Sequence, residues 1–444
     1  MEVLIKASQL ILSLSILVVL HEMGHFFPAK WFKMRVEKFY LFFDPWFSLF
    51  KKKKGDTEYG IGWIPLGGYV KISGMIDESM DKEQMKKPPE PWEFRSKPAW
   101  QRLIVMVGGV TMNLILSIVI YAMLIFVFGD TYLPTANVKD GVWCIDSLAE
   151  EVGFKNGDKI ISLDGKHIEK FQDVTSEMFY ATTIQINRAG KDTTLTIPDN
   201  FIARLVDKRR PFLYPRIPFI VGDFSPESKA KKAGLKKRDK LIALNDTALN
   251  YFDEFKSRTA LYKNQVIKVK VKRGDEELEL NIPVDSTGKI GVAPGFMDFK
   301  SLKTAGIYEF SVTEYGFFES FPKGISKAVT ILSDYIRQFK LIFNFNTGAY
   351  KGVGSFISIG DLFPATWNWE VFWQLTAFLS VMLAFMNILP IPALDGGHVM
   401  FLIYEVITGR KPSDKFLEYA QYVGMALLLS LMVYALGNDI FRLF

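Results

Sequence analysis

The chain has 444 residues, 49% hydrophobic and 14% aromatic, which excludes disordered and fibrous classes because so much apolar surface must be buried. Its net charge of +6 is modest, and no basic stripe is interleaved with aromatic residues, so we expect no nucleic-acid partner. One cysteine, Cys144, excludes an internal disulfide and a cysteine-rich metal site. Charged residues avoid whole stretches, which predicts a membrane protein that carries soluble domains.

The first apolar stretch, residues 3–20, contains one charged residue, Lys6. It predicts a transmembrane helix within 1–29, because a bilayer core needs about 20 residues and a lysine near the end can reach the interface. A cleaved signal peptide is the alternative, but no small-residue cleavage site follows the apolar run. The run leads instead into His21-Glu22-Met23-Gly24-His25.

This HExxH sequence has the spacing of a zinc site. On a helix His21 and His25 lie about 40° apart and one turn removed, so both imidazoles can bind one metal ion. Glu22 flanks the pair, where it can act as the general base toward a water molecule at the metal. Such residues are costly in a membrane unless they face a polar cavity. The alternative is a polar cluster at the interface that binds no metal.

Three further windows of 27, 24 and 19 residues lack charged residues. With their flanks, they predict transmembrane helices at 103–129, 371–399 and 419–438. The short connections at 30–102 and 400–418 are rich in Lys and Arg, with fifteen in the first, and should therefore be cytoplasmic. Both termini and the long segment after the second helix then lie on the other side of the membrane.

An internal repeat lies in that long segment. The sequence that begins Gly153-Phe154-Lys155 and ends at Ile161 aligns with the one at 234–242, at an offset of 81. Each copy runs into alternating strands that end in a turn, which predicts two tandem β-rich domains at 130–210 and 211–296. The repeated sequence resembles the core of PDZ domains, although Arg238 stands in the second copy where that family usually has glycine. Neither copy contains a clear Gly-Leu-Gly-Phe loop of the kind that binds a peptide carboxylate.

An amphipathic helix is predicted within the segment 297–370. Its apolar residues recur at spacings of three and four: Ile325, Val329, Leu332, Ile336, Phe339 and Phe343. Packing onto the membrane interface and packing onto the preceding domain explain this pattern equally well.

The third span contains a second polar cluster, which runs from Asn387 to His398. Pro390 and Pro392 should break the helix there, and the pair Gly396-Gly397 should keep the backbone mobile.

Asp395, within that cluster, is the candidate third metal ligand. His398 is the rival ligand, and a helix cap at Asp395 is the alternative that involves no metal. In the orientation that the Lys and Arg residues predict, His21 and Asp395 both lie at the cytoplasmic ends of their spans. That orientation does not depend on these two residues, so their agreement supports a shared site.

Together, HExxH, the Asn-x-x-Pro-x-Pro-x-Leu-Asp-Gly sequence and the PDZ-like repeat resemble the site-2 protease family, and within it the bacterial type that regulates sigma-E. The resemblance implies one Zn²⁺ per chain, held by His21, His25 and Asp395, with Glu22 as the base and Asn387 as a substrate-binding residue. It implies a polytopic α-helical membrane protein with about four transmembrane helices, a membrane-associated β-hairpin at 58–74 and two extracytoplasmic PDZ-like domains.

The hairpin is glycine-rich and offers a strand edge onto which an extended substrate could add. Gly62, Gly67 and Gly68 are therefore candidate substrate-binding residues, and a structural plug over the cytoplasmic opening is the alternative.

The resemblance also implies a function. We expect an intramembrane zinc metalloendopeptidase of the bacterial cytoplasmic membrane, with its active site near the cytoplasmic side of the lipid bilayer. Its partner would be a single-span membrane protein, an anti-sigma factor already trimmed by another protease. The alternative is a membrane scaffold without proteolytic activity that presents two PDZ-like domains.

Overall fold

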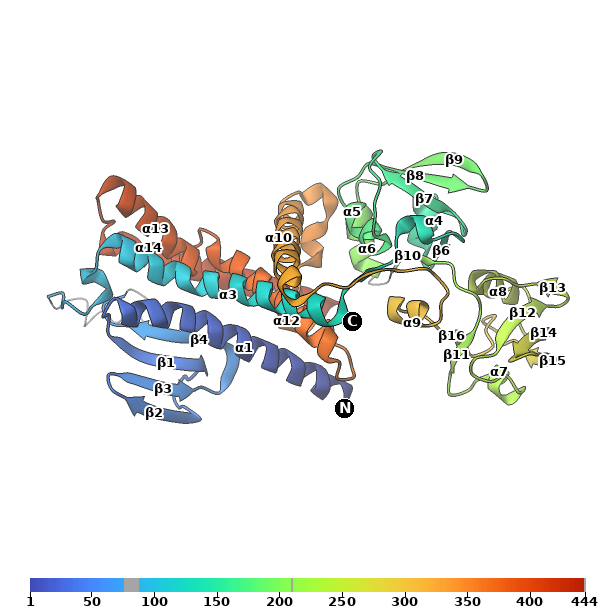
Figure 1. The fold of residues 1–444 in the computed structure, drawn as a ribbon, viewed down its shortest axis with the longest axis horizontal. Coiled ribbons are helices and arrows are strands. Elements are labelled where there is room, and N and C mark those ends of the chain that lie inside the picture. Colours follow the sequence, from blue (N-terminus) through green and yellow to red (C-terminus); the bar gives the residue numbers. More distant parts are fainter. Residues whose placement is uncertain (76–87, 209–210, 443–444) are drawn as a thin grey trace. The chain divides into compact units, whose positions relative to one another are not determined.

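The computed structural model describes residues 1–75, 88–208 and 211–442 (Figure 1). The chain divides into two compact units. The first consists of Met1–Gly129, Glu314–Phe343 and Tyr350–Phe444, and the second of Asp130–Thr313 and Asn344–Ala349.

Within the described residues, four helices of the first unit are long and apolar enough to cross a membrane. They are α1 (Glu2–Trp31), α3 (Ala99–Phe128), α12 (Trp369–Ile388) and α14 (Asp414–Phe441). The four predicted spans are thereby confirmed as helices, and the chain is a multi-pass membrane protein. Helix α3 packs against both α1 and α12, and it also contacts α10 and α13 (Figure 1).

Helices α1 and α3 cross at a pair of glycines. A Cβ atom on Gly24 would overlap the carbonyl group of Gly108, and a Cβ atom on Gly108 would overlap that of Gly24. Small residues allow two helix backbones to approach closely, which is how helices associate in a membrane, where apolar burial supplies little driving force. The crossing therefore holds the HExxH turn directly against α3.

The third span is interrupted, as the two prolines predict. Helix α12 ends at Ile388, and a separate helix α13 (Asp395–Thr408) begins after the break, so part of the predicted loop 400–418 is helical. The expectation of a mobile Gly396-Gly397 pair is wrong. Both glycines are buried, and a Cβ on either would overlap backbone atoms of the residues between the two helices. Their role is close packing, which fixes the start of α13.

A four-stranded sheet follows α1. Its strands are β1 (Val36–Phe43), β2 (Phe50–Lys54), β3 (Thr57–Ile61) and β4 (Ile64–Ile72), in the order β2-β3-β1-β4. The hairpin predicted at 58–74 is wrong, because β1 lies between β3 and β4 and pairs with both. The eight residues of β1 are largely apolar and aromatic, which favours a strand, and this strand pairs with β3 on one side and β4 on the other. Strands β1 and β4 pack against α1 (Figure 1).

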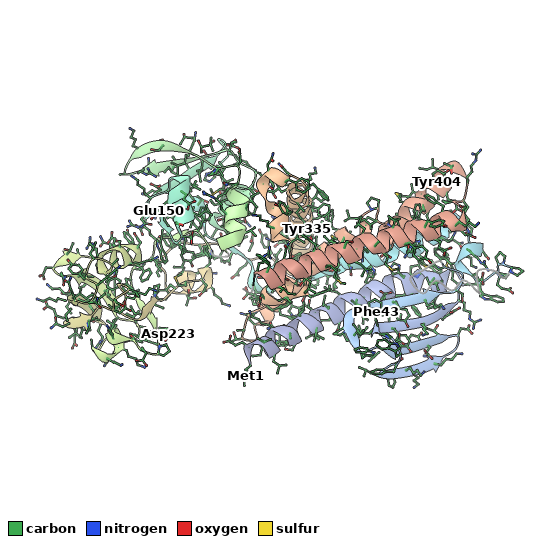
Figure 2. All side chains as sticks on the ribbon, turned by 180° about the vertical axis from the view of Figure 1, so that it is seen from behind. Met1, Phe43, Glu150, Asp223, Tyr335 and Tyr404 are labelled. Carbon is green, nitrogen blue, oxygen red and sulfur yellow. The ribbon has the colours of Figure 1, made fainter. Side chains whose placement is uncertain are left out.

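The predicted amphipathic helix is α10 (Phe317–Ile342), and it lies across α3 (Figure 1). It buries its small residues, Ser320, Gly324 and Ala328, and a Cβ on Gly324 would lie 2.7 Å from the backbone of α3. Tyr335, which is labelled in Figure 2, contacts Phe385 of α12 edge to face. Most of the large apolar residues that defined the helix in the sequence are exposed, namely Ile325, Val329, Ile336 and Phe343. The short helix α11 (Phe356–Asp361) completes this unit.

The second unit contains two β-rich repeats. The first has β6 (Val142–Cys144), α4 (Ser147–Val152), β7 (Lys159–Leu163), α5 (Val174–Glu177), β8 (Thr183–Arg188), β9 (Lys191–Thr196), α6 (Phe201–Lys208) and β10 (Leu213–Pro215). The second has β11 (Val221–Phe224), α7 (Lys229–Lys232), β12 (Lys240–Leu244), β13 (Thr247–Ala248), α8 (Phe252–Thr259), β14 (Val266–Arg273), β15 (Glu276–Pro283) and β16 (Val292–Pro294). The order β7-β8-β9 corresponds to β12-β14-β15, and the pair β6-β10 to β11-β16.

Each repeat is held by the same buried ion pair. Arg188 contacts Asp158 at 2.7 Å in the first repeat, and Arg273 contacts Asp239 at 2.7 Å in the second. Burial alone would raise the pKa of Asp239, but the Arg273 guanidinium and the Lys236 amide outweigh it and hold this pKa below its ordinary value. The offset of 81 that aligned the sequences relates Asp158 to Asp239, whereas the two arginines lie 85 residues apart.

The boundaries differ from those predicted. Strand β10 pairs with β6, so the first repeat extends to residue 215 and past the predicted limit of 210. Helix α9 (Phe299–Thr304) begins the predicted connector, yet Leu302 and Tyr308 are buried in the core of the first repeat. The strands β5 (Asp130–Tyr132) and β17 (Ser311–Thr313) pair where the chain begins and ends this unit.

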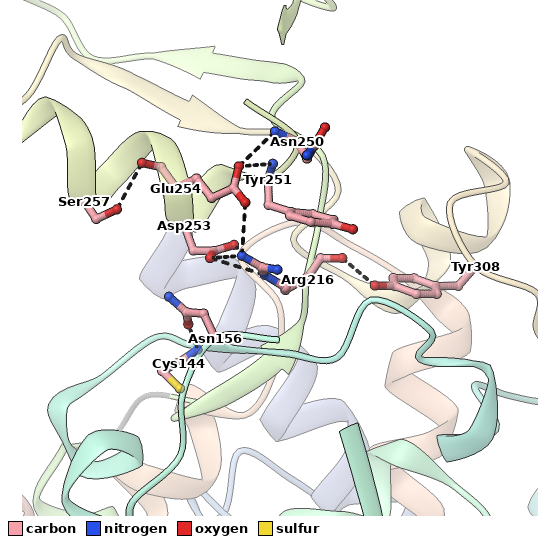
Figure 3. Close-up of polar contacts among 9 residues, drawn as sticks. All are labelled: Cys144, Asn156, Arg216, Asn250, Tyr251, Asp253, Glu254, Ser257 and Tyr308. Atoms are coloured by element: carbon pink, nitrogen blue, oxygen red, sulfur yellow. Dashed lines mark hydrogen bonds and ion pairs between the residues drawn. The ribbon is translucent and has the colours of Figure 1, made fainter. Parts of the chain in front are cut away.

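Arg216 joins the two repeats (Figure 3). It follows β10 of the first repeat and contacts Asp253 of the second at 2.7 Å and Glu254 at 3.4 Å. Its guanidinium lies 4.1 Å from the ring centroid of Tyr251, and its carbonyl oxygen accepts a hydrogen bond of 2.5 Å from the Tyr308 hydroxyl. A planar guanidinium that is paired, stacked and buried fixes a joint far better than a flexible ammonium would.

We predict that Arg216→Ala loosens this joint, because removing one partner of a buried ion pair costs about 3–5 kcal/mol. Spin labels at the exposed residues Lys191 and Lys263, in a chain whose single Cys144 is replaced by serine, should give one narrow distance distribution. Arg216→Ala should broaden it.

Arg188→Ala is the matched control, because it breaks a similar ion pair inside the first repeat. An equally narrow distribution in Arg216→Ala would contradict the joint.

Candidate metal centre

Three predicted residues converge where the C-terminal half of α1 meets the first turn of α13. His21 Nε2 lies 3.2 Å and His25 Nε2 lies 3.3 Å from Asp395 Oδ2, and the two Nε2 atoms are 3.3 Å apart. Within the described residues, these three form the one group of His, Cys, Asp or Glu side chains with the spacing of a metal site. The break in the third span makes this possible, because Asp395 is the first residue of α13.

The spacing of the three atoms fits zinc. Ligand atoms that lie about 2.0–2.1 Å from a tetrahedral zinc ion stand about 3.3–3.4 Å from one another. The observed distances of 3.2, 3.3 and 3.3 Å match this spacing. Two imidazoles and one carboxylate, with the fourth position left for water, also form a typical ligand set for a catalytic zinc site.

The protonation of His25 supports the same reading. Its Nδ1 lies 2.8 Å from the carbonyl oxygen of Val105, which can only accept a hydrogen bond. In the neutral ring Nδ1 therefore carries the hydrogen, and Nε2 presents a lone pair toward Asp395. Asp395 Oδ2 is itself buried and accepts no hydrogen bond. A metal ion between these facing lone pairs would stabilise them, because all three side chains could bind it.

Helix α3 forms the wall behind both imidazoles. A Cβ on Gly109 would lie 2.6 Å from His21 Cε1 and closer still to His25 Nε2, so only glycine leaves room for the two rings. Asn113 Nδ2 lies 3.2 Å from His21 Nδ1, and Asn387 Nδ2 from α12 lies 3.4 Å from His21 Nε2.

The three candidate ligands line a cavity of about 540 Å³ in the membrane unit. Glu22, predicted as the base, is buried and also lines it. The remaining wall includes residues of α1, α3, α12, α14 and β4, and most of it is apolar. In such surroundings the charged form of the Glu22 carboxylate would be stabilised by a nearby cation, and the candidate ligands could hold one.

The glycines predicted to bind substrate separate into two groups. Gly67 and Gly68 of β4 line the cavity, and a Cβ on Gly68 would lie 2.6 Å from Val18 Cγ1 of α1. Gly62 lies in the turn before β4, where its amide donates a 2.8 Å hydrogen bond to the Leu41 carbonyl. Gly62 is not among the residues that line the cavity, so the cavity gives no support for its role in substrate binding.

His398, the rival ligand, lies one turn beyond Asp395 and lines the cavity but is not part of the three-residue group. Sequence reasoning also missed Gln421 of α14, which is 4% exposed and lines the cavity. An amide within the first turns of an apolar span was the signal that could have found it.

Comparisons with known proteins agree with this chemistry. The model of peptidase family M50 matches residues 9–431. A Haemophilus influenzae protein named regulator of sigma E protease is 29% identical over 468 residues, with 98% of each chain covered. The Escherichia coli regulator of sigma-E protease RseP is 28% identical over 454 residues, again with 98% of each covered. A Vibrio cholerae protein whose name describes a zinc metalloprotease is 28% identical over 460 residues, with the same coverage.

We predict that Asp395→Ala loses most of the bound zinc, because it leaves two imidazoles as the only protein ligands. His398→Ala should retain it, and it serves as the matched control from the same helix turn. Metal content of the purified protein measures both. Retention in Asp395→Ala together with loss in His398→Ala would make His398 the third ligand.

Proposed function

We propose that this chain, which belongs to peptidase family M50 and is a zinc metalloprotease, hydrolyses a peptide bond within or near the transmembrane segment of single-span membrane proteins. Family membership confirms the resemblance to site-2 proteases that the sequence motifs indicated. The observation that carries the proposal is the zinc-like spacing of His21, His25 and Asp395 in a cavity among apolar helices.

Glu22 is the proposed general base. When bound, zinc supplies Lewis-acid chemistry that activates a water molecule and polarises a peptide carbonyl. The Glu22 carboxylate accepts the proton of that water and then delivers it to the leaving amide nitrogen. The side-chain amide of Asn387 lies near the metal ligands and can donate a hydrogen bond to the carbonyl oxygen as its negative charge develops.

Strand β4 is the proposed docking edge for substrate. A transmembrane helix hides its peptide bonds in internal hydrogen bonds, so it must become extended before hydrolysis. In the described part of the chain β4 has β1 as its one strand neighbour, and residues 67–72 of β4 line the cavity. An extended substrate added beside β4 would have its backbone hydrogen-bonded near the metal ligands. Gly67 and Gly68 would keep that edge free of bulk. The alternative role for this sheet, a plug over the cytoplasmic opening, would leave the edge unused.

The proposed substrate is an anti-sigma factor that another protease has already trimmed. Relatives named for regulating sigma E support this choice. The proposed location is the bacterial cytoplasmic membrane, with both termini and the two repeats outside and the metal centre near the cytoplasmic side, as the distribution of Lys and Arg indicates.

The two repeats, which we propose to be PDZ-like domains, would act as a size filter. Arg216 joins them into one block, and neither sequence contains a carboxylate-binding loop. A bulky outer domain on a substrate would collide with this block, whereas a short stub would pass. A scaffold without activity is the alternative function, but a complete set of zinc ligands and a base argues against it.

We predict that Glu22→Gln retains zinc but loses cleavage of a single-span substrate in detergent, by about 10²–10⁴-fold, because an amide cannot accept the proton. Zinc content and cleavage are measured on the same preparation. Full activity with normal zinc content would remove Glu22 from the role of base, and inactivity of the wild-type chain on every such substrate would favour the scaffold.

We predict that the wild-type chain cleaves a substrate with a short outer stub and spares the same substrate with a folded outer domain. Deleting residues 140–294 should allow both to be cleaved, since the proposed obstacle is then gone. Zinc content of the deletion variant serves as the control for folding. A zinc-loaded deletion variant that still cleaves only the trimmed substrate would contradict the filter.

A further inference from the structure

Asn113 is a buried polar residue of α3 to which the proposed mechanism assigns no role. Its side chain is fully buried in a largely apolar helix, where an amide is costly unless it has a partner. Its nitrogen Nδ2 lies 3.2 Å from His21 Nδ1, while its oxygen Oδ1 is buried and accepts no hydrogen bond.

The chemistry of a metal-bound imidazole determines which atom of Asn113 should face His21. If Nε2 binds a metal, the neutral ring carries its hydrogen on Nδ1, and Nδ1 can only donate. The amide nitrogen of Asn113 can also only donate, so two donors would meet. A half-turn of the side-chain amide exchanges its two ends and brings the unsatisfied Oδ1 to Nδ1.

We propose that Asn113 is a positioning residue whose Oδ1 accepts the hydrogen of His21 Nδ1 and so directs the Nε2 lone pair toward the metal. The inference rests on the proposed ligand set. It makes the carbonyl end of the amide, rather than its bulk or its NH₂ group, the feature that zinc binding requires.

The arrangement on α3 supports this role. Val105, Gly109 and Asn113 follow one another at intervals of four residues and therefore share one face of the helix. The carbonyl of Val105 already accepts a hydrogen bond from His25 Nδ1 at 2.8 Å, and Gly109 leaves space for both rings. With Asn113 as the second acceptor, one helix face sets the hydrogen position of both metal-binding imidazoles.

The test compares two substitutions of nearly equal volume. Asn113→Leu has neither donor nor acceptor, and Asn113→Asp keeps only acceptors. Zinc affinity is measured by competition with a chelator, together with thermal unfolding of the zinc-free forms. Ser117→Ala is the matched control, because Ser117 is fully buried one turn further along the same face and donates to the Leu114 carbonyl.

We expect Asn113→Leu to weaken zinc binding about 10–100-fold, and Asn113→Asp and Ser117→Ala to bind as tightly as the wild type. Rescue by aspartate separates hydrogen-bond acceptance from packing, which both substitutions preserve. If Asn113→Leu does not fold, the smaller Asn113→Ala, which also lacks an acceptor, takes its place in the comparison with Asn113→Asp.

Wild-type zinc affinity in a folded Asn113→Leu, or weakened binding in Asn113→Asp, would overturn the inference. His21→Ala distinguishes this failure from that of the ligand set. If it retains zinc, the ligand set is wrong and the inference with it. If it loses zinc while Asn113→Leu binds normally, only the role of Asn113 is wrong.

Discussion

The close contact between α1 and α3 at Gly24 and Gly108 is the constraint on which the metal centre depends. The overlap that a single Cβ would cause at either glycine means that the two backbones touch at the HExxH turn. This contact brings His25 within hydrogen-bond distance of the Val105 carbonyl and both rings against Gly109. Two histidines in an apolar span are costly by themselves. Helix α3 offsets this cost, because the Val105 carbonyl and the Asn113 side chain lie within hydrogen-bond distance of the two rings and orient them for a metal.

The interruption of the third span supplies the rest of the site. Non-helical backbone at membrane depth is tolerated where protein buries it or where it lines a cavity. Residues between Ile388 and Asp395 meet this condition, since a Cβ on Gly424 of α14 would overlap the Pro392 carbonyl. Ala393 adopts a positive φ of 88° in this break, a strained conformation that persists only where its surroundings fix it. The strain lies two residues before the candidate ligand Asp395, and strained residues often cluster at functional sites.

Much of this could be predicted from the sequence. Three charge-free windows and one apolar stretch with a single lysine located the four spans, and the spacing of His21, Glu22 and His25 located the candidate site, because both patterns are local. The strand order of the sheet could not be predicted. Strands β3 and β4 are neighbours in sequence, but β1 lies between them and pairs with both, and local sequence does not show this. The roles of Gly109 and Asn113 were equally inaccessible, because they arise from contacts between distant segments. Gly396 and Gly397 were misread because glycine permits both mobility and close packing, and only the neighbouring backbone decides between them.

The central claim is that one zinc ion is bound by His21, His25 and Asp395. X-ray absorption spectroscopy at the zinc edge of the detergent-solubilised chain tests it most directly. We predict one zinc per chain, with two imidazole nitrogens at about 2.0–2.1 Å and carboxylate oxygen at about 2.0–2.2 Å. A spectrum without two imidazoles, or with a sulfur ligand at about 2.3 Å, would contradict the account.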